Sequence, residues 1–199
     1  MKQLADFDTG KLCGVQTDRG YNQATSSGRP FWSFDPQPQD IDIEDIAAHL
    51  SRVCRFNGAL RDDVEIYTVA QHCCLVSDHC PTGFKLEGLL HDAAEAYCGD
   101  LIKPIKMQLP TWKPMELKIE AVIRRKYDLP PVISPEVKEQ DYLAVATEHR
   151  DVQTLTAFVD WEHLPTPWPE KVIPWSVMKA RSEFLNRFRR LTYGQRHAQ

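Results

Sequence analysis

The sequence has no long apolar run. None of its segments approaches the ~20 apolar residues that a helix needs to cross a bilayer. The first twenty residues, MKQLADFDTGKLCGVQTDRG, also lack the apolar core of a secretory signal peptide. We therefore expect a cytoplasmic protein that does not associate with a membrane.

Cysteine patterns typical of zinc knuckles or disulfide frameworks are also missing. The chain of 199 residues has six cysteines, but none forms a CxxC pair, and Cys73 and Cys74 are adjacent. This spacing suits neither a structural zinc site nor a simple set of disulfides. We expect reduced thiols that pack as small core residues.

The chain carries no excess of positive charge and no nucleotide-binding glycine motif. Its formal net charge is -4, which argues against broad electrostatic binding to a nucleic acid polymer. Neither GxGxxG nor a Walker loop occurs, and no repeat of 20–50 residues is present. Alternation of apolar and polar residues over strand length is absent as well, which leaves an all-α fold as the expectation.

Helical periodicity is present instead. Ile43, Ile46, Ala47 and Leu50 recur at three- and four-residue intervals, so we expect an amphipathic helix over 43–54. Start signals for later helices are a capping box formed by Thr68 and Gln71, a threonine at 111, and Ser134 followed by proline. The further helices are expected over 68–80, 84–98, 111–127, 135–151 and 176–191.

These helices predict one compact domain over residues 29–199. Residues 1–28 are expected to form an N-terminal extension or arm, and the first 40 or so residues look irregular. The proline-rich stretch 164–174 is expected to be an extended loop. The predicted architecture is therefore all-α, with six or seven helices in a single domain.

Polar residues stand where three of the expected helices should be apolar. His72 lies on the apolar face of one helix, His91 and Asp92 follow two leucines in the next, and Asp141 lies on an apolar stripe of a third. Each alone fits a hydrogen-bonded core residue, but isolated buried charges cost several kcal/mol. Together they form a set of two nitrogen and two oxygen ligands. Such a set suits Mn²⁺, Co²⁺, Zn²⁺ or Fe²⁺ better than Ca²⁺.

The order His72, His91–Asp92, Asp141 resembles the H…HD…D signature of the HD-domain metal-dependent phosphohydrolases. Three segments carry the resemblance: YTVAQH (67–72), LLHDAAEAYCGDLIKPIK (89–106) and VKEQDYLAVATEHRD (137–151). They are similar to small bacterial and prophage-encoded HD proteins that act as 5′-deoxyribonucleotidases. Related viral HD proteins hydrolyse deoxynucleoside triphosphates. The similarity extends from about residue 30 to 190.

The resemblance implies a single HD-domain helical fold, a homo-oligomer and a divalent metal ion. His72, His91, Asp92 and Asp141 would be the metal ligands, and Mg²⁺ joins the ions named above as a candidate. Glu95 would orient or deprotonate the attacking water, and Asp100 would protonate the leaving 5′-oxygen.

The resemblance and the residue chemistry also suggest substrate contacts. Arg55 in RFNG looks like the family's phosphate contact, and its planar fork suits two phosphate oxygens. Phe56 is a candidate for stacking on the base or deoxyribose, with a core position as the alternative. Lys103, together with Lys106, is a candidate for further positive charge, with simple surface placement as the alternative. His79 is a candidate extra ligand or phosphate donor.

Glu148 and Arg150 belong to the ATEHRD stretch of the resemblance. We expect them to form an ion pair within the helix or between subunits, with a substrate role as the alternative.

The leading functional hypothesis is a 5′-deoxyribonucleotidase, which converts a deoxynucleoside monophosphate to deoxynucleoside and phosphate. The alternatives are a deoxynucleoside triphosphate triphosphohydrolase, which releases triphosphate, and a non-catalytic nucleotide sensor.

Overall fold

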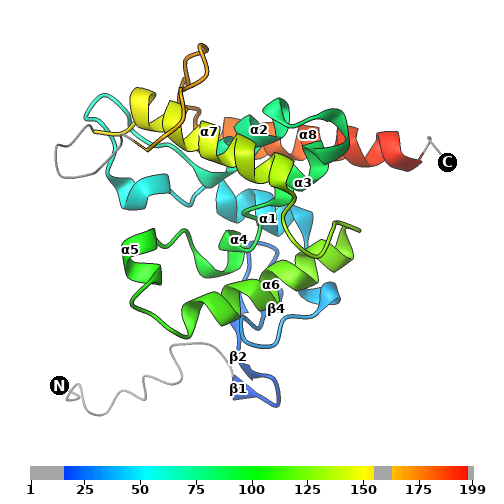
Figure 1. Cartoon of the computed structure of the whole chain (residues 1–199). Helices are drawn as coiled ribbons and strands as arrows, with labels where there is room; N and C mark the ends of the chain where they lie inside the picture. Colours follow the sequence, from blue (N-terminus) through cyan, green and yellow to red (C-terminus); the bar gives the residue numbers. More distant parts are fainter. Residues whose placement is uncertain (1–15, 155–162, 197–199) are drawn as a thin grey trace, which may run out of the picture.

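The computed structural model describes residues 16–154 and 163–196 and is mostly helical, as predicted (Figure 1). None of the described helices is both long enough and apolar enough to cross a membrane. The α-helices are α1 (Ile43–Leu50), α2 (Val69–His79), α3 (Lys85–Leu90), α4 (Glu95–Cys98), α5 (Lys103–Lys106), α6 (Trp112–Lys126), α7 (Pro135–Asp151) and α8 (Val177–Arg196).

The expectation of a purely α-helical chain needs a correction near the N-terminus. Two short antiparallel pairs occur there, β1 (Gln16–Thr17) with β2 (Gly20–Tyr21), and β3 (Gln23–Ala24) with β4 (Pro30–Phe31). Strands of two residues are too short for an alternating pattern to be visible in the sequence. The predicted division between residues 28 and 29 falls inside the second pair, and residues 1–15 lie outside the described part. The division therefore stays a prediction.

The second pair packs on the helical body. Phe31 is fully buried, and its ring stacks on Tyr97 of α4 with the centroids 3.9 Å apart. Between the two strands, the backbone N–H and the hydroxyl of Ser27 both donate to the buried carboxylate of Asp45 in α1. These contacts join the N-terminal hairpin to α1 and α4.

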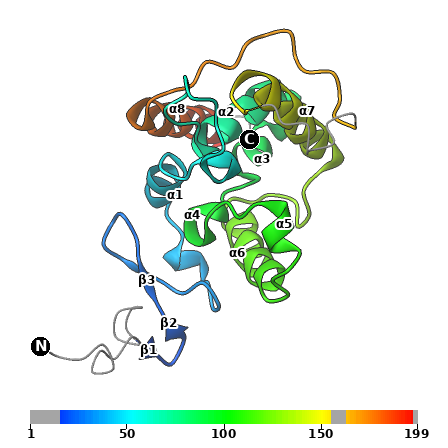
Figure 2. The same cartoon turned by 90° about the vertical axis from the view of Figure 1, so that its left-hand side faces the viewer.

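The helices form two groups. In both views α2, α3, α7 and α8 lie above α4, α5 and α6 (Figure 1, Figure 2). Helix α2 packs against α3, α7 and α8, while α4 packs against α6. The core between them includes Cys73 and Cys74, which are buried free thiols as predicted, whereas Cys13 lies outside the described residues. The short connection from α3 to α4 joins the two groups.

The helix predicted over 84–98 is interrupted in the structure. After α3 ends at Leu90, the chain runs through turns at 91–94 before α4 begins. The N–H groups of Ala93, Glu95 and Ala96 donate to carbonyls only three residues earlier. This tightening is characteristic of 3₁₀ geometry, which within a longer helix often marks a functional hinge or a strained sequence. His91 and Asp92 lie in this tightened stretch.

Thr68 begins α2 as predicted, but the capping box is incomplete. Its hydroxyl oxygen accepts from the N–H of Gln71 at 3.2 Å. The Gln71 side chain does not return to Thr68. It donates to the carbonyl of Ile173 and accepts from the N–H of Trp175, both at 2.8 Å. Gln71 thus fastens the segment before α8 to the helix that carries His72.

Thr111 and Ser134 precede α6 and α7 as predicted, but neither side chain caps its helix. The Ser134 hydroxyl instead donates to Glu87 of α3 at 2.7 Å, and its backbone N–H donates to the same carboxylate at 2.8 Å. Arg124 of α6 completes the arrangement at 2.6 Å. Both charged side chains are almost fully buried, so Glu87 ties α3 to α6 and to the start of α7.

Replacing Glu87 by alanine is expected to reduce the free energy of unfolding by about 3–5 kcal/mol, because Arg124 would remain buried without its partner. Denaturant unfolding measures this change. Glu44→Ala is the matched control, since the ion pairs of Glu44 with Arg181 and Arg189 lie at the surface. Loss of such surface pairs costs at most about 1 kcal/mol. Equal effects of the two substitutions would contradict the role given to Glu87.

Candidate metal centre

Three side chains from separate parts of the chain converge at one point. His72 comes from α2, His91 from the turn after α3, and Asp141 from α7. Nε2 of His72 lies 3.2 Å from Nε2 of His91 and 3.1 Å from Oδ1 of Asp141, and the His91–Asp141 distance is 3.7 Å. Metal–ligand bonds of about 2.1 Å would place neighbouring ligand atoms roughly 3.0–3.4 Å apart. This cluster could therefore hold a metal ion.

The hydrogen bonds of the two imidazoles direct both free lone pairs to the same point. Nδ1 of His72 lies 2.6 Å from Oε1 of Glu148, and Nδ1 of His91 lies 2.8 Å from the carbonyl oxygen of Gly88. Because both partners are acceptors, each neutral ring carries its proton on Nδ1. The two Nε2 lone pairs then face each other. A cation between them would remove this repulsion, so the donor set fits a metal ion.

Asp92, the fourth predicted ligand, borders this cluster. Its Oδ2 lies 3.2 Å from Nε2 of His91 and 3.5 Å from Nε2 of His72. The side chains of Asp92 and Asp141 are 24% and 40% exposed, whereas those of His72 and His91 are 0% and 2% exposed. The imidazoles therefore form the buried floor of the cluster, and the carboxylates lie on the side that solvent reaches.

The electrostatics of the cluster favour a cation. Burial lowers the pKa of His91, but Asp92 and Asp141 outweigh it and raise that pKa well above its usual value. Burial likewise raises the pKa of Asp141, but the neighbouring imidazoles of His72 and His91 lower it overall. The carboxylates thus stay ionised and stabilise positive charge between them.

Glu95, to which the resemblance assigns a role at the attacking water, lies beside the cluster. It is buried, and its Oε2 has no hydrogen-bond partner among the described residues. Burial, followed by the charges of Asp92 and Asp100, raises the pKa of Glu95 well above its usual value. Glu95 shares a cavity of about 110 Å³ with His91, Asp92 and Lys106. A carboxylate with a raised pKa is a stronger base than an exposed one, so Glu95 is suited to accept a proton next to the cluster.

Asp100, just beyond α4, belongs to the same electrostatic group. Burial raises its pKa, Arg55 lowers it, and Asp92 raises it again, so that the net direction is upward. A raised pKa keeps a carboxyl group protonated up to a higher pH than usual. Asp100 is half-buried, which leaves it accessible for proton transfer.

Arg55, the predicted phosphate contact, lies next to the carboxylates of Glu148 and Asp92. Its guanidinium is 3.1 Å from Glu148 and 3.6 Å from Asp92, and its buried Nε has no partner in the part of the chain that the structure describes. Phe56 follows directly, with its ring centroid 5.2 Å from the guanidinium carbon. Phe56 and Asn57 have φ of +56° and +53°, an uncommon and strained conformation for residues other than glycine.

Two predicted substrate contacts do not lie with the cluster. His79 stacks on Trp168 with the ring centroids 3.6 Å apart, and its Nδ1 contacts the carbonyl of Leu75. His79 follows His72 by seven residues, or two helical turns, which places it about 10 Å further along α2. Lys103 is exposed, and Lys106 rather than Lys103 reaches Glu95, at 3.4 Å.

The structure corrects the expected pairing of Glu148 and adds it to the site. Glu148 is fully buried and contacts His72, Arg55 and the hydroxyl of Tyr67, none of which lies on its own helix. Arg150 pairs with its neighbour Asp151 instead. The signal for this was the spacing, since Glu148 follows Asp141 by seven residues, or two turns on the same helical face.

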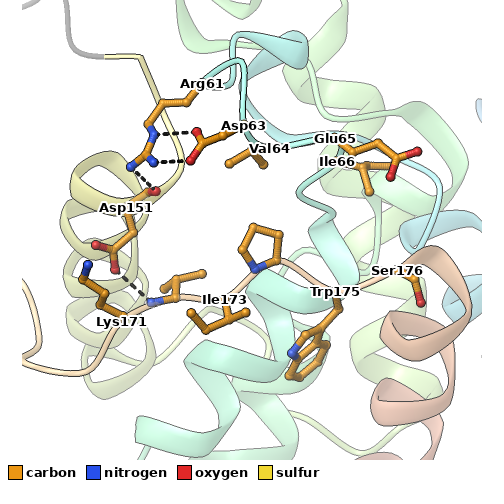
Figure 3. Close-up of a pocket in the computed structure, with 12 residues that line it drawn as sticks. Arg61, Asp63, Val64, Glu65, Ile66, Asp151, Lys171, Ile173, Trp175 and Ser176 are labelled. Atoms are coloured by element: carbon orange, nitrogen blue, oxygen red, sulfur yellow. Dashed lines mark hydrogen bonds and ion pairs between the residues drawn. The ribbon is translucent and has the colours of Figure 1, made fainter.

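A larger cavity of about 420 Å³ lies elsewhere, between the segments 61–66 and 171–176 (Figure 3). Three of its charged groups already have partners: Arg61 binds Asp63, and the Asp151 carboxylate accepts from the N–H of Val172 (Figure 3). None of the predicted site residues lines it. The smaller cavity at His91 is therefore the better candidate for chemistry.

Comparison with known proteins gives relatives without a described activity. No protein-family profile matches the chain. It is similar to the uncharacterized protein YfdR of Escherichia coli strain K12, with 44% identity over 171 residues, covering 84% of this chain and 94% of that protein. It is also similar to the uncharacterized protein RCAP_rcc00048 of Rhodobacter capsulatus, with 35% identity over 124 residues, covering 58% of this chain and 63% of that protein.

Proposed function

The chain belongs to the same protein family as YfdR of Escherichia coli, and from its own site we propose that it is a metal-dependent phosphohydrolase of deoxynucleotides. The first choice is a 5′-deoxyribonucleotidase, which hydrolyses a deoxynucleoside monophosphate to deoxynucleoside and phosphate. The observation that supports this most is the convergence of His72, His91 and Asp141 beside a carboxylate oxygen of Glu95 that has no partner among the described residues.

His72, His91, Asp92 and Asp141 would hold the metal ion. When bound, a divalent ion would neutralise charge on the phosphoryl oxygens and lower the pKa of a bound water towards about 7. Two nitrogen and two carboxylate donors accept Mn²⁺, Co²⁺, Zn²⁺, Fe²⁺ and, with more retained water, Mg²⁺. The protein's contribution is a rigid buried floor of imidazoles and a carboxylate side open to solvent.

Arg55 would bind the phosphate group. Its guanidinium is fixed by Glu148 and Asp92, while the buried Nε has no partner among the described residues. A planar guanidinium recognises two oxygens of one phosphate, and its positive charge offsets the negative charge of the phosphate ester. Phe56, held beside Arg55, would contact the sugar or base.

Glu95 and Asp100 would move the protons. Glu95, with a raised pKa, accepts a proton from the attacking water and orients its oxygen towards phosphorus. Asp100, whose pKa is also raised, carries the proton that the leaving 5′-oxygen needs. Two carboxyl groups beside one cluster thus supply a base and an acid for the same displacement.

Product analysis tests this function. The metal-stripped protein is loaded in turn with Mn²⁺, Co²⁺, Mg²⁺ or Zn²⁺ and incubated with deoxynucleoside mono-, di- and triphosphates, and the products are separated by chromatography. We expect deoxynucleoside and phosphate from dAMP, with metal-stripped protein inactive. Release of triphosphate from dATP without turnover of dAMP would replace this proposal with a triphosphohydrolase. Nucleotide binding without any hydrolysis would favour a sensor.

A further inference from the structure

Glu148 contacts the two halves of the candidate site at once. It lies on α7 with no exposed surface, and its two carboxylate oxygens have different partners. Oε1 contacts Nδ1 of His72, and Oε2 accepts from the guanidinium of Arg55. We propose that Glu148 is a positioning residue that orients His72 as a metal ligand and Arg55 as the phosphate-binding group. This inference rests on the proposed metal centre and its function.

The contact with His72 sets which ring nitrogen faces the cluster. A carboxylate only accepts hydrogen bonds, so at 2.6 Å Nδ1 of His72 is the donor and Nε2 offers its lone pair. The fixed bond also prevents rotation of the ring away from His91 and Asp141. An outer carboxylate of this kind increases the basicity of a metal-binding imidazole and orients it. Glu148 therefore binds the ring nitrogen that faces away from the cluster and so orients His72 for metal binding.

The second oxygen holds Arg55. The 3.1 Å bond to one terminal nitrogen leaves the other terminal nitrogen 3.6 Å from Asp92. Glu148 thereby balances the positive charge of Arg55, which would otherwise pair more closely with Asp92 and compete for that ligand. Tyr67 donates to Oε1 at 2.8 Å and completes the hydrogen bonds of the carboxylate. One buried group thus maintains the separation of the arginine from the metal ligands.

A buried ion pair that only stabilises the fold is the competing explanation, and Glu87 provides its matched example. Glu87 is 3% exposed, pairs with the buried Arg124 and accepts two further hydrogen bonds from Ser134. None of these contacts includes a member of the metal cluster. Glu87 and Glu148 are therefore two buried glutamates whose carboxylates each have several hydrogen-bond partners. Of these two, Glu148 contacts a candidate metal ligand and Glu87 does not.

The experiment compares Glu148→Gln with Glu87→Gln in the full-length chain. Each is stripped of metal and titrated with Co²⁺, with binding followed by visible absorption and without nucleotide. Glutamine keeps the size, but its NH₂ group cannot accept from Arg55 or His72. We expect Glu148→Gln to weaken Co²⁺ binding by about 10–100-fold and to alter the absorption bands. Glu87→Gln should change Co²⁺ affinity by less than about threefold, although both variants lose thermal stability.

Equal Co²⁺ affinity in Glu148→Gln and wild type would overturn the inference. If Glu148→Gln does not fold, NMR of the zinc-loaded wild type with ¹⁵N-labelled histidine decides. A proton on Nδ1 of His72 supports the inference, and zinc bound through Nδ1 overturns it.

The result for Glu148 can be distinguished from the result for the proposed function. Weakened Co²⁺ binding in a protein that hydrolyses no nucleotide would support Glu148's orientation of His72 and reject the phosphohydrolase. Hydrolysis with unaltered Co²⁺ binding in Glu148→Gln would do the reverse.

Discussion

His91→Ala protein is expected to lose metal binding and deoxynucleotide hydrolysis together. His91 contributes the nitrogen that lies within 3.7 Å of His72, Asp92 and Asp141, so its removal opens the centre of the cluster. The loss of metal affinity should exceed the ~10–100-fold that follows from losing an outer hydrogen-bond partner. Asp92→Ala should act in the same direction. Metal analysis after dialysis and turnover of dAMP measure the two effects.

His79→Ala is the control for this prediction. His79 is the last residue of α2, but its ring lies against Trp168 and not in the cluster. The His79→Ala protein should bind metal like the wild type. Retention of metal by His91→Ala, or an equal loss in His79→Ala, would contradict the assignment of the ligands.

Glu95→Gln should slow turnover by about 10²–10⁴-fold, the range typical of losing a general acid or base. Metal affinity should remain close to that of the wild type, because Glu95 borders the cluster without belonging to it. Glutamine preserves the size of the side chain and its contact distance to Lys106, but it cannot accept a proton from water at neutral pH. Turnover at saturating metal and a Co²⁺ titration separate the two properties.

Glu116→Gln is the matched control for Glu95. Glu116 lines the same cavity and pairs with the same Lys106, at 2.8 Å, but it comes from α6 and its carboxylate is held by Lys106 and Lys113. Its substitution should change turnover by less than the ~10²-fold lower limit expected for a catalytic acid or base. Wild-type turnover in Glu95→Gln would remove Glu95 from the mechanism, and loss of metal would make it a ligand.

The helices and the ligand cluster could be predicted because each depends on local spacing. An apolar stripe with a polar residue at a core position is visible within one helix, and His72, His91 and Asp141 each fit that pattern. The tightened turns at 91–94 were not predictable, because the residues there remain helix formers and tertiary packing decides the local geometry. The two-residue strands were not predictable, because an alternation of apolar and polar residues cannot be recognised over two residues.

The role of Glu148 could not be predicted from charge alone. A glutamate followed closely by arginine in a helix suggests a local ion pair, yet its partners are residues 76 and 93 positions away. The side chain of Gln71 was expected to complete a capping box, but its partners lie on a segment more than 100 residues further along. Contacts between residues so far apart in sequence depend on the packing of α2 against α7 and α8, which the sequence of a single segment does not determine.

The left-handed backbone after Arg55 has a consequence for variation at this turn. Phe56, Asn57 and Gly58 all have positive φ, and each of the two that carry a Cβ adopts it at an energetic cost of about 1–2 kcal/mol. Glycine at position 56 would relieve the strain of the main chain. It would also remove the ring beside the guanidinium and give the backbone next to Arg55 more conformational freedom. At this turn the strained residue therefore limits the conformations of the loop that carries Arg55, at a cost in stability.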